Sequence, residues 1–208
     1  MAAVLGGAKI SGKIDVIKNL MGKVDYLIIG GGMAYTFYKA MGYEIGNSLL
    51  EEDRISMAKE ILEASENSST ELILPLDVLA ADKFDNDARA EIYKASEIDA
   101  NMMGLDIGPK TIEKFGKIIS KVKTVLWNGP MGVFELANFA NGTFLMAQSI
   151  ADVTAKGAIS IVGGGDSAAA VAKFKMDHKF SHISTGGGAS LEFLEGKKLP
   201  GIEALTEV

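Results

Sequence analysis

Two lysines near the start of the chain are the first residues whose type and spacing suggest chemistry. Lys9 and Lys13 stand four residues apart and follow a short apolar run and the pair Gly6-Gly7. At the start of a helix, two lysines at this spacing can point the same way and bring both charges to one anionic group. The pattern indicates a phosphate-bearing ligand, and solvent-exposed surface lysines are the plainer alternative.

Glycine-rich turns are the second such feature, since 24 of the 208 residues are glycine. The glycines concentrate where an apolar run gives way to a helical pattern, at residues 6–7, 30–32, 163–165 and 186–188. In a parallel α/β sheet these junctions share the carboxyl-terminal edge of the strands, where ligands bind. Glycine lets the backbone approach an anion closely, and helix N-termini offer free N–H groups. Four such turns predict a polyanionic ligand, most simply a nucleotide.

Two nucleotide-binding motifs are matched only in part. Residues 7–14 fit the GxxxxGK pattern of a P-loop, but Ile14 stands where a Ser or Thr must ligate magnesium. Residues 163–168 fit the GxGxxA dinucleotide fingerprint, but no strand ending in an acid follows about 20 residues later. A P-loop is therefore disfavoured. A nicotinamide-dependent oxidoreductase remains a rival that lacks a ribose acid and a catalytic acid–base residue.

Two polar residues at the ends of apolar runs have two possible roles each. Asp166 follows a glycine triplet at an expected helix start, where a carboxylate can hold magnesium on phosphates or cap the helix. Asn128 precedes Gly129-Pro130, which is a common setting for a turn asparagine. The residues alone leave both alternatives open.

Short apolar runs alternate with amphipathic stretches along the whole chain. The runs predict strands at residues 2–5, 25–29, 71–74, 77–80, 104–107, 124–127, 158–162 and 181–184. The stretches predict helices at residues 13–22, 33–41, 53–66, 109–121, 137–151, 166–174 and 189–194. Residues 82–102 are polar and weakly periodic, so we expect them to be irregular. The alternation predicts an α/β fold with a mainly parallel sheet.

The composition excludes several classes of function. The chain has no cysteine and two histidines, which excludes a disulfide framework or thiolate site and disfavours a multi-histidine metal centre. A formal net charge of −6 argues against a general nucleic-acid binder. No apolar run approaches the roughly 20 residues of a membrane span, and no signal-peptide pattern is present. We therefore expect a cytoplasmic protein.

Six blocks of the sequence, in order, resemble segments of the phosphoglycerate kinase family. They cover essentially the whole chain and lie at residues 6–9, 28–34, 103–109, 127–135, 163–166 and 184–192. They match only the carboxyl-terminal, nucleotide-binding half of this two-domain family. The resemblance implies one Rossmann-like three-layer α/β/α domain over residues 1–208, expected to be monomeric. It also implies a tail, residues 196–208, which in the family reaches back to the amino-terminal domain that this sequence lacks.

The resemblance implies phosphoryl transfer between 1,3-bisphosphoglycerate and MgADP, giving 3-phosphoglycerate and MgATP. Such a transfer depends on positioning and charge neutralisation rather than on covalent catalysis. By position, Lys9 and Lys13 match lysines that contact the phosphates and the transferred group, Asn128 matches a residue near the phosphates, and Asp166 matches a magnesium ligand. Backbone N–H groups for the transferring phosphate are implied at Gly186, Gly187 and Gly188.

The resemblance also assigns the nucleoside end of the site. Glu135 is expected to accept hydrogen bonds from the ribose hydroxyls, with a solvated charge as its alternative. The adenine walls are expected at Gly30, Gly31, Gly32, Leu105, Pro130 and Val133, with Leu49 and Phe84 added, and their alternative is core packing. The remaining nucleotide contacts are expected at Gly7, Gly104, Gly132, Gly165 and Ser167.

The sequence departs from the family pattern at two positions. Gly12 stands where the family usually has Asp, and Met102 stands where it usually has Trp. Glycine is expected to loosen the start of the first helix by up to ~1 kcal/mol. The methionine leaves the loop 95–102 and one wall of the adenine pocket in question.

This half is expected to bind MgADP or MgATP with little or no turnover, since the acceptor site and domain closure are missing. A non-catalytic nucleotide-sensing domain is the second rival.

Overall fold

A six-stranded, fully parallel sheet forms the centre of the computed structural model, which describes residues 1–184 and 186–205. Its spatial order is β3-β2-β1-β7-β8-β9. The strands are β1 (Ala2–Leu5), β2 (Tyr26–Ile29), β3 (Glu71–Ile73), β7 (Thr124–Asn128), β8 (Ile159–Gly163) and β9 (His182–Ile183). Numbered along the chain within this sheet, the order is 3-2-1-4-5-6, as in a Rossmann fold.

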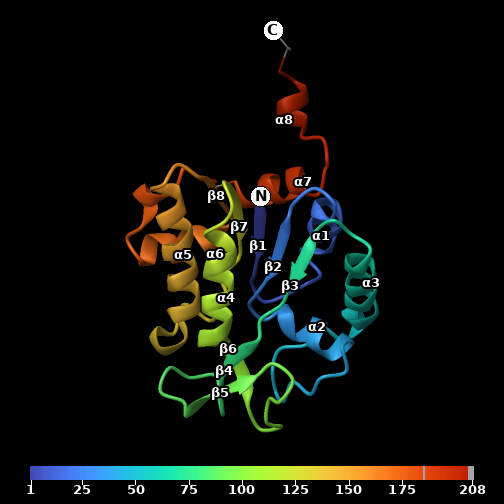
Figure 1. Ribbon diagram of the computed structural model, residues 1–208, viewed down its shortest axis with the longest axis vertical. Coiled ribbons are helices and arrows are strands. Elements are labelled where there is room, and N and C mark those ends of the chain that lie inside the picture. Colours follow the sequence, from blue (N-terminus) through green and yellow to red (C-terminus); the bar gives the residue numbers. More distant parts are fainter. Residues whose placement is uncertain (185, 206–208) are drawn as a thin grey trace.

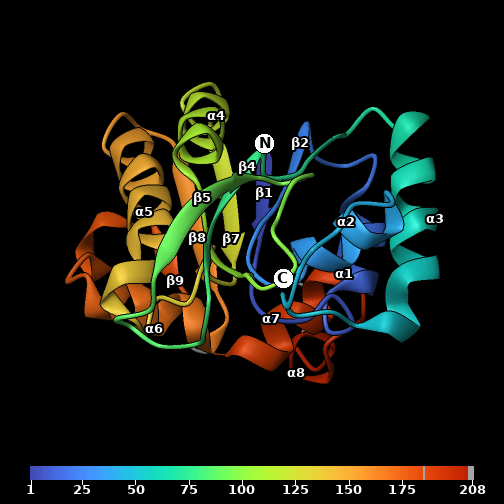
Figure 2. The same cartoon turned by 90° about the horizontal axis from the view of Figure 1, so that it is seen from below.

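Helices cover both faces of the sheet, which confirms the predicted α/β architecture (Figures 1 and 2). One face carries α1 (Ile14–Leu20), α2 (Ala34–Ala40) and α3 (Ile55–Glu66). The other carries α4 (Pro109–Ile119), α5 (Asn141–Thr154) and α6 (Gly165–Lys173). The chain then forms α7 (Gly187–Leu194) and α8 (Pro200–Glu203). Short 3-10 turns occupy Glu52–Arg54, Ala137–Phe139 and Asp177–Lys179.

The central strand shows why the apolar runs are continuous rather than alternating. In β1, Ala3 and Leu5 enter the core beneath α1 to α3, while Ala2 and Val4 enter the core beneath α4 to α6. All four residues are completely buried. A parallel strand covered on both faces needs apolar side chains at every position, and this is the signal that locates the strand in the sequence.

A second, antiparallel sheet corrects one expectation. Residues 82–102 were expected to be irregular, yet β5 (Ala90–Lys94) lies within them. It pairs with β4 (Asp77–Ala81), which also pairs with β6 (Met103–Ile107). Most of β5 is exposed, so it has no buried face to impose an apolar alternation. Figure 1 shows this small sheet at one end of the molecule, with α8 extending from the other end.

The two departures from the family pattern lead to different local structures. Met102 is 1% exposed in the core, and its carbonyl accepts a hydrogen bond from Asn47 N at 2.8 Å, so the loop before it is packed. Gly12 is exposed, and α1 begins at Ile14, one residue later than predicted.

The tail contains α8, and its residues 206–208 lie outside the described residues. Within the described ranges no helix is long and apolar enough to cross a membrane.

A buried aspartate ties the small sheet to the first turn of α4. Asp77 is 2% exposed and accepts hydrogen bonds from Thr111 N at 2.8 Å, Thr111 Oγ1 at 2.6 Å and Lys110 N at 3.1 Å. Gly108 makes this approach possible, because a Cβ there would lie 2.4 Å from the Asp77 carboxyl carbon. Two otherwise unpaired N–H groups at the helix start are thereby satisfied.

A second buried aspartate lies where β6 meets α5. Asp106 accepts from Gly142 N at 2.7 Å and from Ile107 N at 2.9 Å. A Cβ at Gly132 would lie 2.1 Å from its Oδ1. Burial raises the pKa of Asp106 to about 7, although the hydrogen bonds from Gly142 and Ile107 act in the opposite direction. This carboxyl group therefore joins α5 and the loop at residue 132 to the small sheet.

We expect Asp77→Ala to destabilise the fold by about 2–3 kcal/mol, because it leaves buried donors of α4 without an acceptor. Urea unfolding followed by circular dichroism measures the change. Asp82→Ala is the matched control, since Asp82 is exposed and surface changes usually stay within about 0.5 kcal/mol. Equal stability of the two variants would contradict the capping role of Asp77.

Asp106 should make the fold less stable as pH rises from about 4 to 7. In that window the folded protein holds a proton that an unfolded aspartate, with a pKa near 3.9, has released. This stabilisation is complete below the unfolded pKa and is lost as pH rises through the folded pKa. Asp106→Asn removes the titration, so its stability relative to the unaltered chain should increase between pH 5 and pH 8. A difference that does not change with pH would show that Asp106 titrates normally.

Candidate functional site

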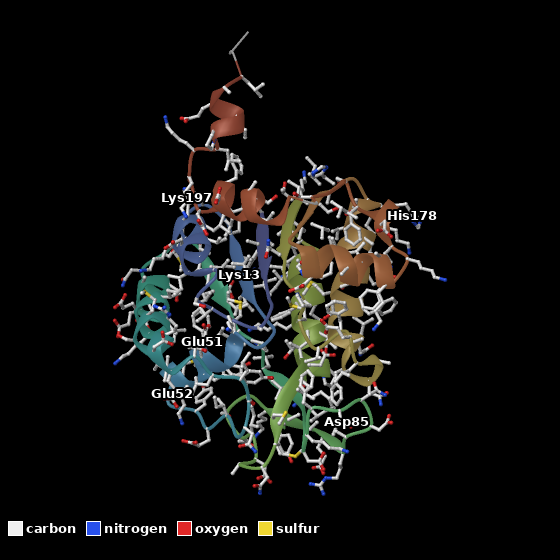
Figure 3. The ribbon with its side chains drawn as sticks, turned by 180° about the vertical axis from the view of Figure 1, so that it is seen from behind. Lys13, Glu51, Glu52, Asp85, His178 and Lys197 are labelled. Carbon is white, nitrogen blue, oxygen red and sulfur yellow. The ribbon has the colours of Figure 1, made fainter. Side chains whose placement is uncertain are left out.

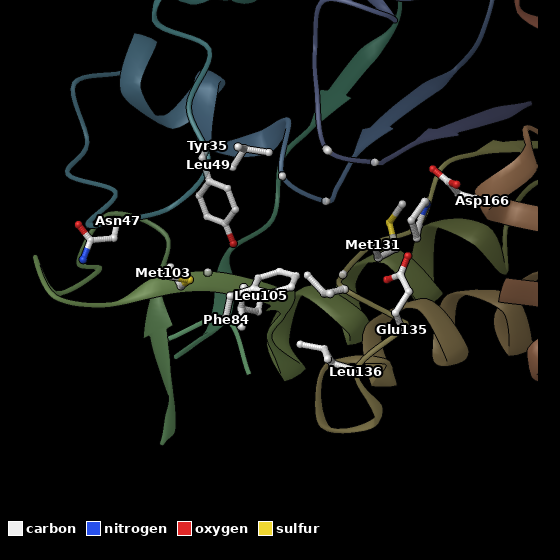
Figure 4. Close-up of a pocket in the computed structure, with 18 residues that line it drawn as sticks. Tyr35, Asn47, Leu49, Phe84, Met103, Leu105, Met131, Glu135, Leu136 and Asp166 are labelled. Carbon is white, nitrogen blue, oxygen red and sulfur yellow. The ribbon is translucent and has the colours of Figure 1, made fainter. Parts of the chain in front are cut away.

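Two adjoining cavities lie at the carboxyl-terminal ends of the central strands. The first, of about 530 Å³, lies between the loops after β1, β2 and β7 and the small sheet (Figure 4). The second, of about 390 Å³, lies between the loops after β1, β7 and β8. Gly7, Ala8 and Asp166 line both. A ligand can therefore extend from one cavity into the other.

The place of these cavities follows from the strand order. The order reverses between β1 and β7, which are neighbours in the sheet but far apart in the chain. At such a switch point the two following loops diverge to opposite faces and leave a crevice at the strand ends. Gly6 and Gly7 follow β1, Asn128 ends β7, and Gly129 follows it. All four line the second cavity.

Backbone contacts between the loops hold the crevice open at a fixed width. Gly6 N donates to Asn128 O at 2.9 Å and Gly7 N donates to Pro130 O at 2.9 Å. Gly31, at φ +68°, packs so closely that a Cβ would lie 2.6 Å from Gly7 N. Position 31 therefore requires glycine, because the two backbones approach too closely there to leave room for a Cβ.

Other glycines of the site are not required by the protein's own packing. A Cβ at Gly165 or Gly188 would meet no atom within 4 Å among the described residues. Gly165 nevertheless opens α6, where glycine costs up to ~1 kcal/mol relative to alanine. Space kept clear in front of a helix N-terminus suits an anionic ligand that approaches the backbone.

A lysine and an asparagine form the polar floor of the second cavity. Lys13 Nζ donates to Asn128 Oδ1. Burial lowers the pKa of Lys13, and the negative charge of Asp166 offsets this only in part. Asn128 is 2% exposed, and within the described ranges its Nδ2 has no hydrogen-bond partner. The cavity thus presents an incompletely compensated cation and an unsatisfied buried donor, which together favour an anion.

Hydrogen bonds to Glu51 hold the loop that carries the two lysines. Glu51 accepts hydrogen bonds from Ser11 N at 3.1 Å and Ser11 Oγ at 2.6 Å. Burial would raise the pKa of Glu51, but these hydrogen bonds lower it below its usual value. Lys9 is exposed at the rim of the second cavity, whereas Lys13 lies deeper. Figure 3 labels Lys13 and Glu51 near the middle of the molecule.

The first cavity is mainly apolar. Leu105 forms part of its buried wall, while Leu49 and Phe84 are 46% and 63% exposed at its rim. In the loop that carries Glu135, Phe134 O and Glu135 O accept hydrogen bonds from Lys173 Nζ at 2.7 and 3.1 Å. This lysine belongs to α6, so it ties the loop of Glu135 to the helix that begins beside Asp166.

The structure brings most of the predicted site residues to these cavities. The first is lined by Gly7, Gly31, Gly32, Leu49, Phe84, Gly104, Leu105, Pro130, Gly132, Val133, Glu135 and Asp166. The second is lined by Gly7, Lys9, Lys13, Asn128, Gly165, Asp166, Ser167 and Gly188. Ser167 Oγ accepts from Gly129 N at 2.6 Å, so this hydroxyl oxygen already fixes the turn after β7.

A few predicted residues are not among those that line either cavity. Gly30 is buried, and a Cβ there would lie 2.5 Å from Met131 Sδ. Gly186 is exposed before α7, and Gly187 is the first residue of that helix. Thr185, in the same glycine-rich turn, lies outside the described residues.

Several lining residues were not assigned to the site from the sequence. They are Ala8, Tyr35, Asn47, Met103, Met131 and Leu136 in the first cavity, and Gly12 and Gly129 in the second. Gly6 and Gly164, which also line the second cavity, belong to the predicted glycine-rich turns. Tyr35 follows the turn at residues 30–32 by one helical turn, but nothing in the sequence distinguishes it from a core aromatic.

One carboxylate is placed to hold a cation on a bound phosphate. Asp166 lines both cavities at the first turn of α6. Among residues 1–184 and 186–205, no cluster of three or more acidic or histidine side chains could hold a metal ion alone. Mg²⁺ is commonly bound by one or two carboxylates together with phosphate oxygens and water, and Asp166 fits that donor set.

Comparison with known proteins identifies the family. The sequence model described as "Phosphoglycerate kinase" matches residues 1–197. The phosphoglycerate kinase of Chloroherpeton thalassium is 57% identical over 204 residues, covering 98% of this chain and 51% of the relative. That of Prosthecochloris aestuarii is 58% identical over 205 residues, covering 99% and 52%.

Solved structures agree with the sequence comparison. Phosphoglycerate kinase from Coxiella burnetii superposes with a TM-score of 0.92 at 46% identity, over 97% of this chain and 52% of that one. The enzyme from Pyrococcus horikoshii gives a TM-score of 0.82 at 32% identity, over 98% and 51%. The chain spans about half the length of the curated relatives it matches. With its parallel sheet, its strand order and its matched residues, this chain belongs to the phosphoglycerate kinase family.

Proposed function

We propose that this chain is the nucleotide-binding half of a phosphoglycerate kinase and that it binds MgADP and MgATP. The observation that carries the proposal is the pair of adjoining cavities, one mainly apolar and one cationic, which meet at Asp166. An adenosine diphosphate has the same division, with an apolar base at one end and charged phosphates at the other. The ribose then lies near Glu135, at the mouth of the first cavity.

The phosphate end is argued from charge. Lys13 is partly desolvated and Asn128 has an unsatisfied N–H donor, so phosphate oxygens would supply the missing acceptors. Lys9 adds a second, more exposed cation at the rim. Asp166 would hold Mg²⁺, which neutralises phosphate charge when bound. The open space before Gly165 and Gly188 leaves room for phosphate oxygens beside backbone N–H groups.

In the complete enzyme this half would supply MgADP for phosphoryl transfer from 1,3-bisphosphoglycerate. The chemistry requires in-line positioning and neutralised charge, which we assign to Lys13, Lys9 and the backbone of Gly186, Gly187 and Gly188. The phosphoglycerate-binding half has no counterpart in this sequence, so the isolated chain should bind nucleotide with very low turnover.

The oxidoreductase rival finds no support at the dinucleotide fingerprint. The motif follows β8. The next strand, β9, ends at Ile183, and Ser184 is the residue after it. A ribose-binding acid is expected at the end of that strand. The position is filled by apolar and hydroxyl side chains instead.

We expect ADP binding to depend on Asp166 only when Mg²⁺ is present. Asp166→Ala should weaken ADP affinity by about tenfold in excess Mg²⁺, because a metal ligand is lost, and should have little effect in EDTA. Trp127 fluorescence is the measurement, since its indole N–H donates to Gly129 O at 2.8 Å in the turn that lines the second cavity.

Asp177→Ala is the control for this titration, because Asp177 is an exposed carboxylate beyond the other end of α6. NAD is the control ligand. Equal weakening with and without Mg²⁺ would remove the metal role from Asp166. Saturable NAD binding would revive the oxidoreductase, and calorimetry showing no ADP binding would overturn the proposal.

We expect kinase turnover to appear only when the missing half is supplied. The isolated chain should form ATP from 1,3-bisphosphoglycerate and ADP at a very low rate in a coupled assay. Addition of a separately expressed amino-terminal half of one of the relatives should raise the rate, because the acceptor site and domain closure are then restored. Near-normal turnover by the chain alone would contradict the assignment of this chain to half of the active site.

Reconstitution also separates catalysis from nucleotide sensing. Lys13→Met in the reconstituted pair should abolish the added rate, since it removes the buried cation of the second cavity. An inactive pair that still binds nucleotide would favour a sensing domain instead.

A further inference from the structure

A buried tyrosine presents its hydroxyl to the first cavity. Tyr35 lies in α2 and is 4% exposed, with its ring packed edge-on against Tyr38 at a centroid distance of 5.8 Å. It belongs to the cavity lining (Figure 4). The hydroxyl oxygen rests over Gly104, where a Cβ would lie only 1.8 Å away. Glycine at position 104 thus makes room for this hydroxyl.

Within residues 1–184 and 186–205 the Tyr35 hydroxyl makes no hydrogen bond, and it is not one of the fully enclosed side-chain atoms that lack a partner, so its oxygen keeps surface open to the cavity. The hydroxyl of Tyr38, by contrast, donates to Pro75 O at 2.9 Å. The neighbouring donor, Gly104 N, is already bonded to Ser48 Oγ at 2.9 Å. A hydroxyl open to the cavity binds water, so a ligand that displaces this water gains affinity only if it replaces the hydrogen bond. Burial, and to a smaller degree the charge of Asp106, raises the pKa of Tyr35 well above its usual range. The hydroxyl therefore remains protonated and can both donate and accept.

The direction of a bound nucleotide sets which ligand atoms this hydroxyl meets. Figure 4 shows Asp166 and Glu135 toward one side of the cavity, and Tyr35 and Asn47 toward the other. With phosphates near Asp166 and ribose near Glu135, the base enters the part of the cavity where Tyr35 stands. In adenine, the edge farthest from the ribose belongs to the six-membered ring, whose N1 accepts and whose 6-amino group donates. Both match a hydroxyl.

We propose that Tyr35 is a specificity-determining residue whose hydroxyl hydrogen-bonds the polar edge of a purine base in the first cavity. The inference rests on the proposed nucleotide function and goes beyond it, because it gives one side chain the task of reading the base. The surrounding lining is mainly apolar and contributes contact area that any flat base can use. The hydroxyl provides the polar discrimination that such walls lack.

The test compares two ligands and two phenylalanine variants by calorimetry in excess Mg²⁺. ADP carries the polar edge, while benzimidazole riboside 5′-diphosphate keeps the bicyclic shape and lacks N1 and the 6-amino group. Tyr35→Phe should weaken ADP binding about five- to tenfold, the worth of one hydrogen bond. Binding of the benzimidazole compound should change less than twofold. Tyr38→Phe, the matched control, removes a hydroxyl bonded to the backbone and should leave both affinities unchanged.

Two results would overturn the inference while leaving the proposed function intact. Equal weakening of both ligands by Tyr35→Phe would give Tyr35 only a packing role. Unchanged binding of both would show that the hydroxyl is satisfied by solvent alone. If the unaltered chain binds neither ligand, the proposed function fails, and the inference fails with it.

Discussion

The crossing of three backbone loops at the centre of the sheet is the contact on which the rest of the site depends. Gly6 N and Gly7 N donate to carbonyls of the turn after β7, and Gly31 N donates to Met131 O at 3.1 Å. These hydrogen bonds join the loops after β1, β2 and β7 at backbone distance. They set the width of the crevice that the strand order creates. Both cavities adjoin this crossing, so any side chain that separates the backbones would disturb both cavities together.

The glycines of this chain therefore fall into two groups, which differ in whether neighbouring atoms leave room for a Cβ. Gly31 is held by close packing against Gly7, and a Cβ there would meet backbone atoms. Gly165 and Gly188 face open space and are not constrained by any described neighbour. In a sequence both kinds look the same, since each belongs to a glycine-rich turn after an apolar run. The structure separates glycines that close packing requires from glycines that leave space clear, although both kinds line the cavities.

This difference explains how far the sequence alone could predict the molecule. Continuous apolar runs such as Ala2–Leu5 predict buried parallel strands, because both faces of the sheet are covered. The strand Ala90–Lys94 gave no such signal, because its side chains are mostly exposed. Tyr35 escaped attention for a related reason: on α2 it looks like one more core aromatic, and only the fold shows that its hydroxyl reaches the cavity. Hydrogen-bond partners distant in the chain, such as Asp106 and Gly142, are likewise set by tertiary packing.

The two cavities would also contribute in different ways to the binding free energy of the proposed ligand. Apolar walls gain from contact with any base, at roughly 25 cal/mol per Å² of area removed from water, and so favour binding without much selectivity. The second cavity instead holds Lys13 at a partial desolvation cost, which Asp166 offsets only in part. An anionic group that pairs with Lys13 and Asn128 would remove that cost. An incompletely compensated cation therefore lies where the proposed nucleotide would carry its phosphate charge. This is a physical reason for the phosphates, rather than the base, to fix the position of the proposed nucleotide along the crevice.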